Sequence, residues 1–219
     1  TGILPDFIVV DGAEGGTGAA PAEFVEHVGV PMHEALMLVH NTLVGLNLRA
    51  RIHVGAAGKV ITAFDIARTM ALGADWCNSG RGFMFALGCI QSQHCHDDTC
   101  PSGVATQDPT RQRAIVVPLK AERVFNYHQN TLKALKELLS AAGLTHPCQL
   151  GPEHIVRRIS SNEVRSLATL HHWVQPGELL CGEVRVGGHR EPARQQCRDE
   201  RAGLCRGVRL AGAGAQGGR

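Results

Sequence analysis

The chain of 219 residues has few aromatic side chains, no long apolar run and almost no net charge. Aromatic residues make up 4% of the chain, too few for a surface that stacks nucleic-acid bases. A formal net charge of +2 gives no attraction to nucleic acid or to an anionic membrane. No apolar run approaches the roughly 20 residues of a membrane-spanning helix, and no secretory signal is visible at the start. These absences favour a cytoplasmic protein that acts without nucleic acid or membrane.

Cysteine is the residue type that stands out, with eight copies. In a reducing compartment cysteines more often bind metal or react than form disulfides. Three of them, Cys89, Cys95 and Cys100, lie in one short segment. Their close spacing and odd number suit a soft metal centre, because one loop can aim all three thiolates at it. From the residues alone, a zinc site with three cysteines and one histidine is as good a reading as an iron–sulfur cluster. The flanking His94 and His96 are expected to lie in solvent.

The alternation of apolar patterns predicts an α/β fold. Short apolar runs at 6–11, 51–54 and 74–78 are typical of buried strands. Between them, helical patterns begin at Pro31 and cover 63–72. Strands and helices that alternate in this way form βαβ units with parallel strands.

Glycine-rich turns follow the strands and predict a phosphate site. The turns after the second and third strands cover 55–59 and 79–82. Glycine lets the backbone approach a ligand closely and present its N–H groups. In (β/α)8 barrels the loops after the seventh and eighth strands often bind phosphate, and Lys59 or Arg81 supplies positive charge. The alternative is that these are tight βα turns without a ligand.

The second half of the chain has a helical part followed by a segment rich in glycine and arginine. A long helix is predicted at 120–142, a short one at 152–159, and a capping box at Ser160 begins another that ends at His172. Residues 181–219 contain nine glycines and eight arginines but no lysine and no aromatic residue. Such a segment cannot bury a core and is predicted to be disordered. One hypothesis is that a frameshift after residue 180 produced it.

Two segments resemble the FMN-binding glutamate synthase domain family. Residues 15–21, Gly-Gly-Thr-Gly-Ala-Ala-Pro, are similar to the family's Gly-Gly-Thr-Gly-Ala-Ser/Ala-Pro segment. The cysteine spacing and the run Thr-Cys-Pro-Ser-Gly-Val-Ala-Thr-Gln-Asp-Pro at 99–109 are similar to its cluster loop. The resemblance covers residues 3–180 and looks most like the stand-alone proteins that lack the amidotransferase domain.

The resemblance implies a fold and a division of the chain. Residues 1–115 are expected to be the C-terminal part of an FMN-binding (β/α)8 TIM barrel, about strands six to eight, with the iron–sulfur loop at 88–109. Residues 116–180 would be a helical C-terminal extension, before the tail at 181–219. A complete barrel needs eight strands and about 250 residues. Because an incomplete barrel exposes strand edges and its apolar inner face, the chain alone is expected to be poorly stable and inactive.

The resemblance also implies two cofactors, FMN and a [3Fe–4S] cluster, and with it iron–sulfur is favoured over zinc. The cluster ligands would be Cys89, Cys95 and Cys100. The stretches that match the family's flavin-binding loops contain Gly15, Gly16, Thr17, Gly18, Gly58, Lys59, Ser79, Gly80 and Arg81. The catalytic residues stay unassigned.

The implied activity is that of a glutamate synthase, an oxidoreductase of amino-acid biosynthesis. Electrons from an NAD(P)H-linked subunit or a ferredoxin would pass through the cluster to FMN. The flavin would reduce 2-iminoglutarate, formed from 2-oxoglutarate and ammonia or glutamine-derived ammonia, to L-glutamate. The alternatives are a related FMN enzyme that acts on glutamate and an amine, similar to a subunit of methylamine–glutamate N-methyltransferase, and a non-catalytic metal or electron-relay module.

Overall fold

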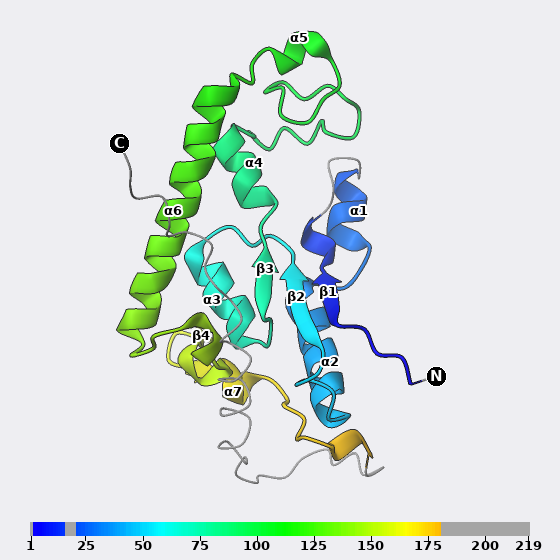
Figure 1. The fold of residues 1–219 in the computed structure, drawn as a ribbon, viewed down its shortest axis with the longest axis vertical. Coiled ribbons are helices and arrows are strands. Elements are labelled where there is room, and N and C mark those ends of the chain that lie inside the picture. Colours follow the sequence, from blue (N-terminus) through cyan, green and yellow to red (C-terminus); the bar gives the residue numbers. More distant parts are fainter. Residues whose placement is uncertain (1, 16–20, 181–219) are drawn as a thin grey trace, which may run out of the picture. The chain divides into compact units, whose positions relative to one another are not determined.

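The computed structural model describes residues 2–15 and 21–180, and its centre is a small parallel sheet (Figure 1). Its strands, paired in sequence order, are β1 (Phe7–Asp11), β2 (His53–Ala57) and β3 (Trp76–Asn78). Ala57 at the end of β2 lies opposite Asp11 of β1 and Asn78 of β3. The carboxyl ends of all three strands therefore meet at one edge. The predicted α/β architecture with parallel strands is confirmed, whereas the predicted tail at 181–219 lies outside the described residues.

Two helices cover one face of this sheet. They are α2 (Met32–Gly45) and α3 (Ala63–Ala71), and they contact the strands from the side that carries Val54 and Ala56. Leu36 and Leu43, seven residues apart on one face of α2, are both buried. The apolar stripes of both helices thus form the core with one side of the sheet.

The other face of the sheet carries apolar side chains that remain in solvent. Phe7 and Val9 are 58% and 42% exposed. The ring of Trp76 lies over Gly55 and meets Phe7 edge to face, with ring centroids 5.8 Å apart. Parallel sheets are normally buried on both faces. Within the described residues, this face of the sheet is therefore apolar and uncovered.

A long helix packs beside the sheet layer. Four further helices are α1 (Ala22–His27), α4 (Arg81–Leu87), α5 (Pro109–Gln112) and α6 (Val117–Ala141). α6 lies against α3 and α4 and buries Leu135 and Leu139 (Figure 1). It begins three residues before the predicted start, with Pro118 in its first turn. Across the described ranges, no helix is both long and apolar enough to cross a bilayer.

The helices predicted at 152–159 and from Ser160 to His172 are wrong. The chain instead forms an antiparallel hairpin of β4 (Val156–Arg158) and β5 (Val164–Ser166), followed by the short helix α7 (Leu167–Leu170). The N–H groups of Ile159 and Ser160 both donate to the carbonyl of Glu163, which closes the turn. Single 3-10 turns complete the described elements at η1 (Ala13–Gly15), η2 (Pro147–Gln149), η3 (Pro152–His154) and η4 (Glu178–Leu180).

One arginine joins three segments at the amino-terminal end of the sheet. Arg49 donates from its guanidinium to the carbonyls of Ile52 and Gly73, at 3.0 and 2.8 Å, and to the Asp75 carboxylate at 2.9 Å. The other oxygen of Asp75 accepts the N–H of Val54 at 2.7 Å. The end of α2, the start of β2 and the turn before β3 are thereby held together, on the side of the sheet away from the glycine turns.

His33 in the first turn of α2 makes stability depend on pH. Burial lowers the pKa of His33 from its ordinary value of 6.5, and the positive charge of Arg68 lowers it further. The carboxylates of Glu34, Glu14 and Asp65 oppose this shift without reversing it. The folded state binds a proton at His33 less readily than the unfolded state does. The contribution of neutral His33 to stability is therefore fully present above about pH 6.5, and it is lost as the pH falls through the lower pKa of the folded state.

We therefore expect His33→Leu to reduce the loss of stability on acidification. Urea unfolding at pH 7.5 and pH 5 should show a smaller fall in midpoint for this variant than for the wild type. His27→Leu, which changes an exposed histidine at the end of α1, is the matched control and should behave as the wild type. Equal falls in the wild type and His33→Leu would contradict the assignment.

Candidate functional site

The two glycine turns lie side by side at the carboxyl edge of the sheet. Gly58 and Lys59 follow β2, and Ser79 and Gly80 follow its neighbour β3. The Ser79 hydroxyl donates to the carbonyl of Val60 at 2.7 Å, so the turns are joined directly. Arg81, the last predicted residue of this group, is the first residue of α4. The structure thus brings together five of the predicted cofactor-binding residues.

The backbone of the first turn is held in a costly conformation. Gly58 has φ +155° and Lys59 has φ +48°, and the left-handed region costs a non-glycine residue about 1–2 kcal/mol. A methyl group on Gly58 would lie 2.6 Å from the side chain of Met32, so α2 requires glycine there. By contrast, a methyl group on Gly80 would meet no atom within 4 Å. The first turn thus carries strained backbone and the second has open space beside it, and strained backbone is often found at ligand-binding sites.

The loop after β1 contributes a carboxylate that caps a helix. Both oxygens of Glu14 accept the N–H of Met32 at 2.9 Å, at the start of α2. The carboxylate occupies the space that a side chain on Gly12 would need. Glu14 therefore has a structural role at the start of α2, and its contacts are not those of a general base. Gly15 is the last residue of η1. The other predicted residues of this loop lie outside the described residues: Gly16, Thr17 and Gly18.

A single short helix connects the second glycine turn to the cysteine loop (Figure 1). α4 has seven residues, which corresponds to a length of about 10 Å. Gly88 ends it in the left-handed conformation with φ +111°, and the N–H of Cys89 donates to the carbonyl of Met84. The first cysteine is therefore fixed directly to the end of α4.

The three predicted cluster cysteines lie on one loop, which begins directly after α4. Burial raises the pKa of Cys95, and the charges of Cys100 and Cys89 raise it further. His94 and His96 are exposed, as predicted. No group of three His, Cys, Asp or Glu side chains in the described part of the chain is gathered closely enough to hold one metal ion. The donor set, three thiols on one loop, is the kind that iron–sulfur clusters take.

Cys100 has the most polar surroundings of the three thiols. Burial raises its pKa, but hydrogen bonds from the Ser102 hydroxyl and from the N–H groups of Ala105, Ser102 and Val104 outweigh that effect and lower the pKa to about 7. The Ser102 hydroxyl lies 3.4 Å from the Cys100 sulfur. Such N–H and O–H donors stabilise a thiolate, the form that binds metal.

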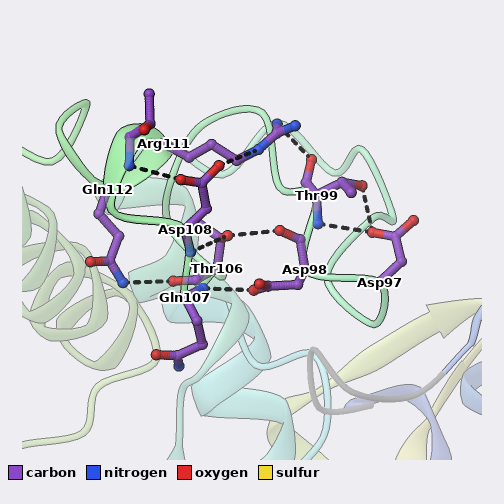
Figure 2. Close-up of polar contacts among 9 residues, drawn as sticks. Asp97, Asp98, Thr99, Thr106, Gln107, Asp108, Arg111 and Gln112 are labelled. Atoms are coloured by element: carbon purple, nitrogen blue, oxygen red, sulfur yellow. Dashed lines mark hydrogen bonds and ion pairs between the residues drawn. The ribbon is translucent and has the colours of Figure 1, made fainter.

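The cysteine loop is closed by a ladder of side-chain hydrogen bonds (Figure 2). Buried Thr106 donates to the carbonyl of Asp98 at 2.7 Å and accepts the N–H of Asp108 at 3.1 Å. The Asp98 carboxylate accepts the N–H of Gln107 at 2.6 Å. Gln112 donates to the carbonyl of Thr106 at 2.8 Å from α5. These contacts join residues 98 and 106–112 across the loop.

The same loop contains several residues in the left-handed region. Gln91, Gln93 and Asp98 have φ values of 55°, 61° and 64°. Arg111 spans the loop, donating to the carbonyl of Thr99 at 3.1 Å (Figure 2). Because the loop has little regular backbone pairing, its shape depends on these side chains. The sequence did not predict these roles: Thr99, Thr106, Gln107 and Asp108 lie in the 99–109 motif, whereas Asp98, Arg111 and Gln112 lie outside it.

Gly103→Ala is expected to open the cysteine loop. Gly103 has φ +74°, and a methyl group there would overlap the carbonyl oxygen of Arg111. Strain and overlap together should cost about 2 kcal/mol or more and make the buried Cys100 react faster with a thiol reagent. Gly143→Ala is the matched control, since Gly143 has φ +71° but open space around it. Equal reaction rates in the two variants would contradict the role of Gly103.

A polar depression of about 390 Å³ lies beside the cysteine loop and apart from the glycine turns. His94 Nδ1 lies 3.0 Å from a carboxylate oxygen of Asp97 on its wall. Hydrogen bonds from Thr99 and His94 hold the pKa of the Asp97 carboxyl well below its usual range. The hydrogen bonds of Asp97 thus serve the loop itself, so the depression adds no separate chemistry to the site.

The chain matches a known family over most of its described length. Residues 2–145 match the family model described as the conserved region in glutamate synthase. The chain is 42% identical over 172 residues to the glutamate synthase large subunit-like protein YerD of Bacillus subtilis, covering 78% of this chain and 33% of that protein. It is 39% identical over 139 residues to the archaeal glutamate synthase (NADPH) of Methanocaldococcus jannaschii, covering 64% and 27%.

The chain spans only part of the curated relatives it matches. Against the glutamate synthase (NADPH) large chain of Bacillus subtilis the identity is 34%, over 63% of this chain and 9% of that one. Among solved structures, a flavocytochrome b2 superposes with a TM-score of 0.44 at 15% identity, covering 87% of this chain and 37% of that one. That similarity is too low to define the fold.

Proposed function

The chain belongs to the glutamate synthase family, and we propose that it carries the FMN-phosphate turns and the iron–sulfur loop of a glutamate synthase-type oxidoreductase. In this proposal residues 1–115 are the part of a (β/α)8 barrel that contains about strands six to eight. Consecutive parallel strands, helices on one face of the sheet and an uncovered apolar opposite face support it. Residues 116–180 act as an extension that packs on the barrel segment through α6.

The observation that carries the proposal is the joining of two glycine turns next to a cysteine loop. The hydrogen bond from Ser79 to Val60 places both turns at one sheet edge, and α4 leads directly from there to Cys89. Phosphate groups bind where backbone N–H groups and a cation converge at the carboxyl ends of parallel strands. The predicted FMN contacts are accordingly Gly58, Lys59, Ser79, Gly80 and Arg81, with Gly15, Gly16, Thr17 and Gly18 on the first loop.

The cysteine loop would hold the second cofactor close by. Cys89, Cys95 and Cys100 are the proposed ligands of a [3Fe–4S] cluster, one thiolate for each iron. Burial and the neighbouring thiols raise the pKa of Cys95, and the positive charge of Arg81 opposes that shift. Arg81 thus acts electrostatically on a cluster ligand while it begins the helix behind the phosphate turn.

The chemistry divides between cofactors and protein. When bound, FMN supplies hydride transfer and the cluster supplies single-electron transfer. The residues of this chain hold the flavin phosphate, present thiolates and shape the loop around them. For the whole enzyme we propose reductive synthesis of L-glutamate in the cytoplasm, from 2-oxoglutarate and ammonia or glutamine-derived ammonia through 2-iminoglutarate. The electron donor is an NAD(P)H-linked subunit or a ferredoxin.

Reconstitution of the purified chain tests this proposal. Under anaerobic conditions with FMN, iron and sulfide, the chain should acquire flavin absorption, a broad iron–sulfur shoulder and about three irons per chain. Glutamate formation by the chain alone is not expected, because the substrate contacts of the family fall largely on strands one to five. A colourless protein that binds zinc in place of iron would overturn the cluster assignment. Glutamate formation by the 219 residues alone would overturn their status as part of a barrel.

A further inference from the structure

The long helix α6 reaches the first glycine turn through a tyrosine. Tyr127 donates its hydroxyl to the carbonyl of Ile61 at 2.5 Å, across 66 residues of sequence. Ile61 lies two residues after Lys59, at the exit of that turn. Tyr127 is the single tyrosine of the chain, and nothing in its sequence surroundings marks it as part of a site.

The same side chain also contacts the second glycine turn. A methyl group on Gly82 would overlap the Tyr127 hydroxyl and lie 2.9 Å from the Ser79 oxygen. The ring of Phe83 meets the Tyr127 ring edge to face, with centroids 5.2 Å apart. The absence of a side chain at buried Gly82 is therefore what lets the hydroxyl lie between the two turns.

Two successive carbonyls directly after the first turn are thus each held by a hydroxyl group. Val60 accepts from Ser79, which belongs to the second turn, and Ile61 accepts from Tyr127, which belongs to α6. The next residue, Thr62, begins α3 through a reciprocal capping box with Asp65. A backbone that holds Lys59 at φ +48° persists only if its surroundings fix it. Tyr127 is the part of those surroundings that α6 contributes.

We propose that Tyr127 is a positioning residue for the phosphate of the bound flavin, an inference that rests on the proposed function. Its hydroxyl holds the two glycine turns at the separation at which their N–H groups and cations act on one phosphoryl group. The extension that carries α6 is thereby a working part of the cofactor site, although no residue of α6 is expected to touch the flavin.

The test compares Tyr127→Phe with Thr131→Val. The first variant removes only the hydroxyl and keeps the ring against Phe83. The second removes a hydroxyl bond within the same helix, from Thr131 to the carbonyl of Tyr127, and touches neither turn. Flavin fluorescence titrations with the 219-residue chain, extended to high ligand concentration, use FMN and riboflavin, which lacks the phosphate.

For Tyr127→Phe we expect FMN affinity to fall roughly tenfold, because the turns lose their alignment. Riboflavin affinity should stay unchanged, a selectivity that a general loss of structure would not produce. Hydrogen exchange without ligand should be faster at 58–62 and 79–83 in this variant alone. Unchanged exchange, or equal losses for both flavins, would overturn the proposal. If the wild type binds no FMN but exchange is still faster in Tyr127→Phe, the FMN assignment fails while the coupling of the turns by Tyr127 stands.

Discussion

Replacing Arg49 with alanine is expected to lower the free energy of unfolding by about 3 kcal/mol. Arg49 is 14% exposed and Asp75 is 31% exposed, so their ion pair is shielded from water. Removing the guanidinium leaves the Asp75 carboxylate without its charged partner, and the carbonyls of Ile52 and Gly73 lose their donor. The N–H of Arg49 Nε also donates to buried His40 at 3.3 Å. The loss is large because one side chain serves four partners.

Thermal unfolding provides the measurement. For a unit of this size, a loss of 3 kcal/mol corresponds to a melting temperature that is roughly 6–12 °C lower. Arg49→Lys should recover only part of the loss, since an ammonium group cannot reproduce the planar fork of the guanidinium. Arg165→Ala is the matched control, because Arg165 pairs with Glu163 at 2.5 Å but is 54% exposed. A solvent-exposed pair contributes about 0–1 kcal/mol.

The control decides between two readings of the network. If Arg49→Ala and Arg165→Ala unfold at the same temperature, the contacts of Arg49 contribute no more than a surface ion pair. If only Arg49→Ala unfolds early, the amino-terminal edge of the sheet depends on this residue. The carboxyl edge of the sheet, where the glycine turns lie, then makes no comparable contribution to stability. In α/β folds, stability and ligand binding commonly occupy opposite ends of the strands in this way.

The elements with long apolar patterns were predictable from the sequence. β1, α2, α3 and α6 have enough apolar residues at one period to determine their type, and Leu36 and Leu43 define the buried stripe of α2. The hairpin of β4 and β5 was not predictable in the same way. Its strands have three residues each, nearly all exposed, so no alternation of buried and exposed positions marks them. Its turn depends on backbone hydrogen bonds to the Glu163 carbonyl, which no local sequence pattern predicts.

The candidate site shows the same division between local and distant information. Glycine turns and cysteine spacing are local, and the sequence revealed both. The bond from Ser79 to Val60 spans 19 residues and that from Tyr127 to Ile61 spans 66. Such contacts follow from how elements pack, which a single sequence does not encode as a pattern. Glu14 is a further case, because its carboxylate accepts the N–H of Met32 at the start of α2, 18 residues away.

The second large effect is expected at Cys100, whose replacement by alanine should abolish the binding of iron. Cys100 is buried, and its sulfur lies among the N–H groups of Ser102, Val104 and Ala105. If the three thiols hold one cluster, loss of the best-stabilised thiolate removes a ligand that neither neighbouring cysteine can replace. Alanine occupies less volume than cysteine, so the ladder around Thr106 should close as before.

Cys77→Ala is the matched control for this experiment. Cys77 lies on β3 and packs against the core, where burial raises the pKa of its thiol to about 12. A thiol held neutral in this way is a weaker metal ligand at neutral pH than one whose pKa is near 7. After anaerobic reconstitution, iron and sulfide per chain should equal wild-type values in Cys77→Ala and approach zero in Cys100→Ala, with unchanged circular dichroism in both. Iron retained by Cys100→Ala would contradict the cluster assignment, and iron lost by both variants would assign the binding to the fold as a whole instead of to the loop.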